Sequence, residues 1–77
     1  MSEKPKKTEV LEKRFGIIAI EKGYITTEEF IEAMKIQVLE DIQGGKHRLI
    51  GEILLGLNQM SITQVEDVLL SLFRKTS

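Results

Sequence analysis

Hydrophobic residues recur at helical spacing along most of this 77-residue chain, and no stretch alternates between apolar and polar positions as a half-buried strand would. The pattern predicts four helices, over about residues 9–22, 26–43 and 48–57, and from residue 61 onward. Residues 1–8 are polar and lysine-rich, and we expect a flexible basic tail there. Residues 9–77 are therefore predicted to form a single helical domain.

The predicted helix ends have characteristic residues. Helix starts are expected where two side chains have the spacing of a capping box, namely Thr26 with Glu29 and Ser61 with Gln64. Helix stops are expected at residues that favour the left-handed conformation, namely Gly23, Gly44 with Gly45, and Asn58. Between these ends, the second helix has an apolar stripe of Phe30, Ala33, Met34, Val38 and Ile42. The fourth has one of Ile62, Val65, Val68, Leu69, Leu72 and Phe73.

The two halves of the chain are copies of one pattern. A shift of 35 residues places Gly16 on Gly51, Ile18 on Ile53, Gly23 on Asn58, Ile25 on Met60, Thr26 on Ser61, and Glu29 on Gln64. Each copy comprises a helix, a turn and a second helix, over about residues 14–37 and 49–72. Because neither copy can bury its apolar face alone, we predict an all-α fold of four helices, arranged as two repeated helical hairpins that pack together.

Charge and composition exclude several classes of function. The 11 basic and 12 acidic residues leave a net charge of −1, so the basic excess typical of a nucleic-acid-binding protein is missing. The chain has no cysteine and one histidine, His47, which argues against a disulfide framework and a metal site. Its longest apolar run, Ile17 to Ile20, is far too short for a membrane span. No nucleophile, phosphate-loop or metal-ligand motif occurs, so we predict a non-enzymatic, cytoplasmic protein without a cofactor.

The first copy resembles a known motif. Residues 14–25 read RFGIIAIEKGYI, and Phe30, Met34 and Gln37 follow. This order of arginine, glycines, apolar residues and glutamine resembles the N-terminal domains of type II secretion and type IV pilus assembly ATPases, in the branch whose tandem motifs bind cyclic di-GMP. The resemblance implies a bacterial, helical, non-catalytic domain, here as a stand-alone chain, that docks to a component of a secretion or pilus machine.

The resemblance also implies a ligand site, in which the arginine and the glutamine contact the nucleotide. In the first copy the cyclic di-GMP contacts would be Arg14, Phe15, Gly16, Gly23 and Gln37. The second copy departs from the motif, because Leu49 stands at the arginine position and Leu72 at the glutamine position. Arg48 is then a displaced second contact. Cyclic di-GMP binding is the alternative to protein docking.

Two features leave alternatives open. The interior glycines Gly16 and Gly51 indicate either close packing of helices or close approach of a ligand to the backbone. The first and third helices are apolar on nearly all sides, so they form the centre of the core or offer part of their surface to a partner or a second copy in a homodimer. The candidate interface residues are Ile17, Ile20, Ile50, Leu54 and Leu57.

Overall fold

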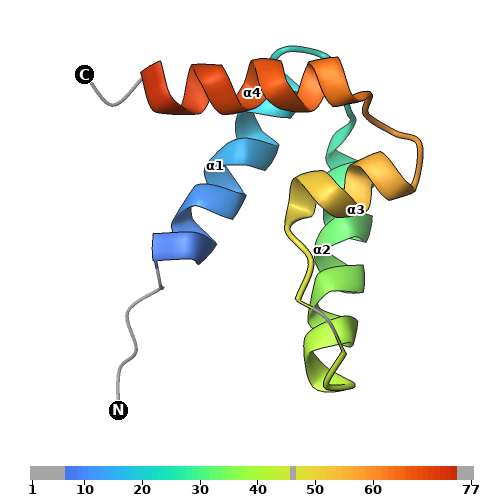
Figure 1. Ribbon diagram of the computed structural model, residues 1–77. Coiled ribbons are helices and arrows are strands. Elements are labelled where there is room, and N and C mark those ends of the chain that lie inside the picture. The colour runs from blue at the N-terminus through green and yellow to red at the C-terminus, as the bar shows by residue number, and fades with distance from the viewer. Residues whose placement is uncertain (1–6, 46, 75–77) are drawn as a thin grey trace.

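The computed structural model describes residues 7–45 and 47–74, with the backbone alone for residues 7–9. It contains four helices, α1 (Lys7–Glu21), α2 (Thr27–Ile42), α3 (Ile50–Gly56) and α4 (Ile62–Arg74) (Figure 1). No strand occurs in the described part of the chain, and the predicted all-α fold of four helices is confirmed. The first helix begins at Lys7, earlier than expected, so only residues 1–6 of the predicted tail lie outside the described residues.

The predicted helix ends are present. Thr26 and Glu29 form a complete capping box, since each side chain accepts a hydrogen bond from the backbone N–H of the other residue, at 3.1 and 2.9 Å. Ser61 and Gln64 repeat this arrangement at the start of α4, at 3.1 and 3.0 Å. The stops after α1, α2 and α3 are left-handed, with φ of +79° at Gly23, +76° at Gly44 and +64° at Asn58.

The repeat seen in the sequence also relates the helices. α1 and α3 end at Glu21 and Gly56, and α2 and α4 begin at Thr27 and Ile62, so the same shift of 35 relates both pairs of bounds. Buried residues of one copy fall on buried residues of the other, namely Phe15 on Ile50, Gly16 on Gly51, Ile18 on Ile53, Ala19 on Leu54, Ile25 on Met60, and Ala33 on Val68. The two halves of the core are therefore built from equivalent positions.

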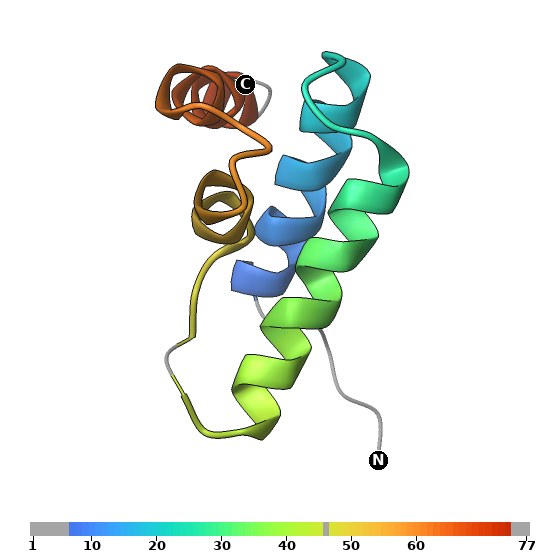
Figure 2. The ribbon, with the colours of Figure 1, turned by 90° about the vertical axis from the view of Figure 1, so that its right-hand side faces the viewer.

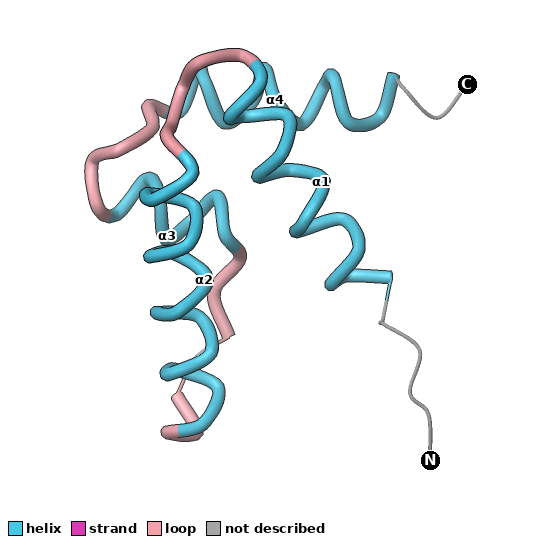
Figure 3. The backbone as a smooth tube through the Cα atoms, turned by 180° about the vertical axis from the view of Figure 1, so that it is seen from behind, coloured by secondary structure: helices cyan, strands magenta, loops and turns pink. Residues whose placement is uncertain are grey.

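The helices pack mainly between the two copies and much less within each hairpin. α1 lies chiefly against α4, and α3 against α2. Figure 2 shows α1 and α2 on one side of the molecule and α3 and α4 on the other. From behind, α1 and α2 diverge from the turn that joins them (Figure 3). Each hairpin is thus open, and the other copy covers its apolar face.

A single apolar core lies where the four helices meet. Its buried side chains come from every helix and from both connecting turns between paired helices: Phe15, Ile18, Ala19, Ile25, Phe30, Ala33, Ile50, Ile53, Leu54, Met60, Val68 and Leu72. No polar or charged residue of the described part is buried among them. The core uses one face of α2 and α4, so the opposite faces of both helices remain outside it.

The interior glycines let aromatic rings approach the helix backbone. A methyl group on Gly16 would overlap the ring of Phe30, which lies directly on α1 at this point. A methyl group on Gly51 would lie 3.1 Å from the ring of Phe15 and 3.5 Å from Val65. Both glycines are buried beneath side chains of this chain, so the structure favours close packing of helices as the reason for their presence.

We predict that Gly16→Ala destabilises the fold by about 1–3 kcal/mol, because the added methyl group displaces the buried Phe30 ring. This loss should exceed the gain of about 1 kcal/mol that alanine brings to a helix interior. Gly51→Ala is the matched control and should cost less, since its nearest neighbour is farther away. Urea unfolding followed by circular dichroism measures both. A Gly16→Ala variant as stable as the wild type would contradict the packing argument.

Candidate functional site

A carboxylate of α1 caps the N-terminus of α3. Glu12 Oε1 accepts a hydrogen bond of 2.7 Å from the backbone N–H of Ile50, the first residue of α3. The residue before it, Leu49, has no side-chain acceptor for a free N–H of this helix. Its own backbone N–H donates to the Glu52 carboxylate at 2.7 Å. Glu12 therefore supplies from 38 residues away the cap that the local sequence lacks.

Gln37 and Arg48, two of the predicted nucleotide contacts, lie in this same cluster and bind other parts of the chain. Gln37 Nε2 donates to Glu12 Oε1 and to the Arg48 carbonyl oxygen, both at 2.8 Å. The Arg48 guanidinium forms a bidentate pair with Glu40, with Nε–Oε1 at 3.2 Å and Nη2–Oε2 at 2.6 Å. This pair holds the pKa of Glu40 below its ordinary value of 4.5. Both side chains thus hold the segment around Arg48, which precedes α3, against α2.

Arg14 does not join this cluster. It is exposed and makes no hydrogen bond or ion pair with any other described side chain. Residues two positions apart on a helix are about 200° apart around the axis. Because Glu12 faces Gln37, Arg14 points to the other side of α1. The arginine and the glutamine of the motif are therefore not brought together.

The remaining predicted nucleotide contacts are structural in this fold. Phe15 is buried in the core, and Gly16 lies beneath the Phe30 ring. Gly23 is exposed and holds the left-handed turn after α1, with open space where a side chain would be. The six predicted contacts thus divide among the core, the polar cluster and the solvent-exposed surface.

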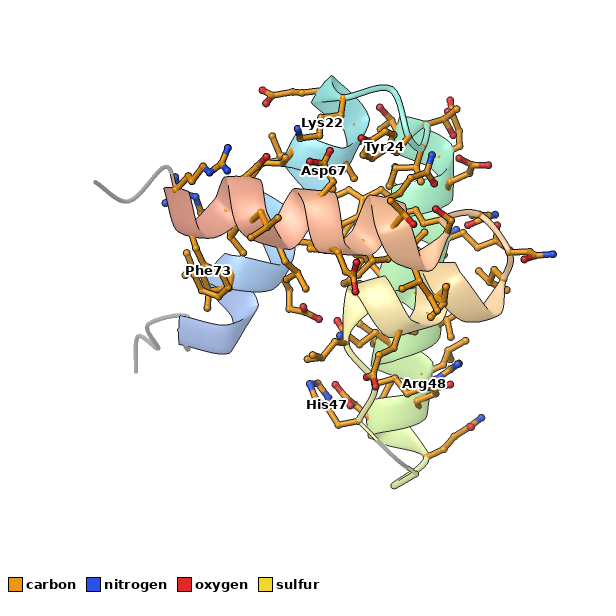
Figure 4. All side chains as sticks on the ribbon, turned by 45° about the horizontal axis from the view of Figure 1, so that its top comes forward. Lys22, Tyr24, His47, Arg48, Asp67 and Phe73 are labelled. Atoms are coloured by element: carbon orange, nitrogen blue, oxygen red, sulfur yellow. The ribbon has the colours of Figure 1, made fainter. Side chains whose placement is uncertain are left out.

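A second polar cluster joins the turn after α1 to α4. The Tyr24 hydroxyl donates to Asp67 Oδ2 at 2.5 Å, and Lys22 Nζ lies 3.2 Å from the same oxygen (Figure 4). The tyrosine hydrogen bond, and then the bond from Lys22, hold the pKa of Asp67 below its ordinary value of 3.8. The same hydrogen bond raises the pKa of Tyr24 above 10.0. The cluster ties the two copies together at the molecular surface.

The outer face of α2 is apolar, and apart from Met34, which packs partly against the core, the rest of the described chain leaves it exposed. Five apolar residues at helical spacing form this face, which we call the α2 stripe: Ile31, Met34, Val38, Leu39 and Ile42. Val38 is 54% and Ile42 74% exposed. The first four of these residues and Lys35 line a shallow groove of about 430 Å³. The last turns of α2 extend past α3 (Figures 1 and 3), which leaves them without a neighbouring helix.

The α2 stripe corrects the sequence prediction for this helix. Phe30 and Ala33 of the predicted stripe are buried, but Val38 and Ile42 point away from the core. The apolar residues of α2 exceed what one helix face can hold, and Ile31 and Leu39 were the signal for a second face. The spacing of these residues in the sequence does not show which of the two faces is buried in the core.

Of the predicted interface residues on the first and third helices, some are buried in the core and others are exposed. Ile50 and Leu54 are 1% and 0% exposed, so they belong to the core and cannot contact a partner. This corrects the prediction, and the reason is that this face of α3 packs against α1, α2 and α4. Ile20 is partly buried against the core. Ile17 and Leu57 are exposed, at 43% and 41%.

The equivalent face of α4 is also partly apolar. The 35-residue shift places Leu69 on Met34, Leu70 on Lys35 and Phe73 on Val38, and all three α4 residues are exposed. Glu66 and Arg74, which the same shift places on Ile31 and Leu39, interrupt this face. The α2 stripe is therefore the more continuous of the two apolar surfaces.

No helix in the part of the chain that the structure describes has the length and hydrophobicity needed to cross a membrane. Within residues 7–45 and 47–74, no three histidine, cysteine, aspartate or glutamate side chains are grouped as metal ligands. Comparison of the chain with protein-family models, curated proteins and solved structures finds no match. The residues and their geometry are therefore the basis for a proposal about function.

We predict that Glu12→Ala destabilises the protein by about 1–3 kcal/mol, because it removes the acceptor of a partly buried backbone N–H. Glu32→Ala is the matched control on an exposed helix face and should stay within about 0.5 kcal/mol of the wild type. Amide hydrogen exchange at Ile50 should also be faster in Glu12→Ala. Unchanged exchange and stability would show that this carboxylate is not a cap.

The Asp67 cluster predicts a defined pH dependence. Since the folded state lowers the pKa of Asp67, its stabilising effect is complete above the ordinary value of 3.8 and is lost as the pH falls through the lowered pKa. We expect Asp67→Asn to lower the urea midpoint at neutral pH and to approach the wild type in acid. Glu66→Gln, on the neighbouring residue, should follow the wild type throughout. If the urea midpoint of Asp67→Asn stayed below that of the wild type in acid as well, this role of Asp67 would be contradicted.

Proposed function

We propose that this chain is a non-enzymatic docking module that binds a protein partner through the α2 stripe. The observation that carries the proposal is the exposure of this continuous apolar face on a helix whose other face is already packed in the core. Contiguous exposed apolar residues on one helix face are typical of an interaction site. Docking a helix into such a surface is a common form of recognition.

Four of the five residues of the α2 stripe lie outside the core, and only Met34 packs partly against it. Ile31, Val38, Leu39 and Ile42 are all more than two-fifths exposed, whereas Phe30 and Ala33 on the other face are buried. Burying an exposed apolar side chain at an interface is favourable by roughly 25 cal/mol per Å² of apolar area removed from water. A partner that covers the stripe would gain this energy without disturbing the core.

The proposed partner class is a component of a type II secretion or type IV pilus machine. Support comes from the motif of residues 14–37, with its glycine, apolar and cap positions in the family order. Cyclic di-GMP is the weaker candidate ligand. Arg14 and Gln37 lie apart, and Gln37 and Arg48 are already hydrogen-bonded to Glu12 and Glu40. The docking interpretation needs none of these groups to be released.

We predict that Val38→Ser weakens binding of a purified assembly ATPase from the same organism by about fivefold or more, because it removes an apolar contact at the centre of the stripe. Stability should change by no more than about 0.5 kcal/mol, since Val38 is 54% exposed. Heteronuclear NMR titration of the labelled chain measures the affinity and locates the surface.

Val68→Ser is the control for the same substitution in the core. Val68 is 0% exposed, so this variant should lose about 2–4 kcal/mol of stability. Shifts spread over α2 on addition of the ATPase would support docking. Shifts confined to the surroundings of Arg14 on addition of cyclic di-GMP, with none from the protein, would favour the nucleotide instead.

A further inference from the structure

The charges on α2, the helix that carries the stripe, are predominantly negative. α2 contains five carboxylates, Glu28, Glu29, Glu32, Glu40 and Asp41, and a single cation, Lys35. Some of these carboxylates have partners within the chain. Glu29 belongs to the capping box, Glu40 pairs with Arg48, and Asp41 Oδ1 lies 2.8 Å from His47 Nδ1.

Two of the carboxylates have no such partner. Glu28 and Glu32 are exposed and make no hydrogen bond or ion pair with any other described residue. They stand one helical turn apart, so they form one row along α2. Ile31 of the stripe and Lys35, which lines the groove, lie beside this row. An occupant of the stripe would therefore meet two carboxylates and the Lys35 ammonium along one edge, which leaves a net negative charge there.

We propose that the occupant of the α2 stripe is a basic amphipathic helix of another protein, with apolar anchors on one face and lysine or arginine residues beside them. This inference rests on the proposed docking function and specifies its partner class. Ile31 to Ile42 spans about 16 Å of helix, or three turns. A stripe of this length can contact apolar side chains at positions i, i+3, i+4 and i+7 of one partner helix. Cationic residues at its edge would pair with Glu28 and Glu32 and set its orientation.

The same charges disfavour the other occupants. A second copy that docked α2 on α2 would bring together two helices that each carry five carboxylates and Lys35 as the only cation. Like charges across an interface are unfavourable. An anionic membrane surface attracts basic segments and repels this acidic one. The charge pattern thus selects a cationic protein segment.

The test uses two synthetic helical peptides that share the same leucine anchors. One carries lysines beside the anchors, and the other carries glutamates at the same positions. In NMR titrations of the full chain at low salt, we expect the lysine peptide to bind at least about tenfold more tightly. Its shifts should lie on the α2 stripe. The preference should shrink as salt is added, because exposed charges are screened.

A charge reversal provides the matched control. Glu28→Lys with Glu32→Lys should invert the preference, so that the glutamate peptide binds more tightly. Glu21→Lys with Glu66→Lys changes the net charge by the same amount at exposed positions on α1 and α4, and should leave the preference intact.

Several results would overturn the inference. Equal binding of both peptides on the stripe would refute the basic partner and leave docking itself supported. The basic partner would also be refuted, and docking supported, if neither peptide bound and the assembly ATPase bound through the stripe. Sedimentation equilibrium showing a dimer that Val38→Ser dissociates would identify a second copy as the occupant. Binding through the stripe to vesicles of phosphatidylcholine and phosphatidylglycerol would identify a membrane.

Discussion

Contact between an aromatic ring and a helix backbone at Gly16 is the constraint on which this fold depends. The Phe30 ring occupies the space that any side chain at Gly16 would need. At the equivalent place in the second copy, Phe15 and Val65 lie against Gly51. These contacts hold α1 and α3 close to their neighbours without long helices. A chain of 77 residues can therefore bury a core from four short elements.

The packing between copies determines which apolar residues remain at the surface. Because α1 lies on α4 and α3 on α2, each hairpin stays open and depends on the other copy. The core then takes only one face of α2. The second apolar face of this helix is left outside, bordered by Glu28 and Glu32. The same arrangement brings Glu12 to the start of α3 and Asp67 to Tyr24, so polar contacts lock the copies at the surface.

Local signals in the sequence were sufficient for the elements and their ends. The capping pairs of Thr26 and Ser61 and the left-handed Gly23 and Asn58 depend on neighbours a few residues away, so spacing predicts them. The candidate sites were less predictable. Arg14 and Gln37 are separated in the sequence as the motif requires. In the structure, however, Glu12 and not Arg14 lies on the side of α1 that faces Gln37. No local signal relates Glu12 to a helix that starts 38 residues later.

The sequence by itself therefore determined an all-α chain of two repeated helix pairs, with its turns and caps. Hydrophobic periodicity and glycine conformation are properties of short segments, and they survive in any packing. Only the tertiary structure decided which of two apolar faces of α2 is buried, and that Ile50 and Leu54 are core while Val38 and Ile42 are surface. That choice is made by steric fit between distant segments, above all by the close approach at Gly16 and Gly51.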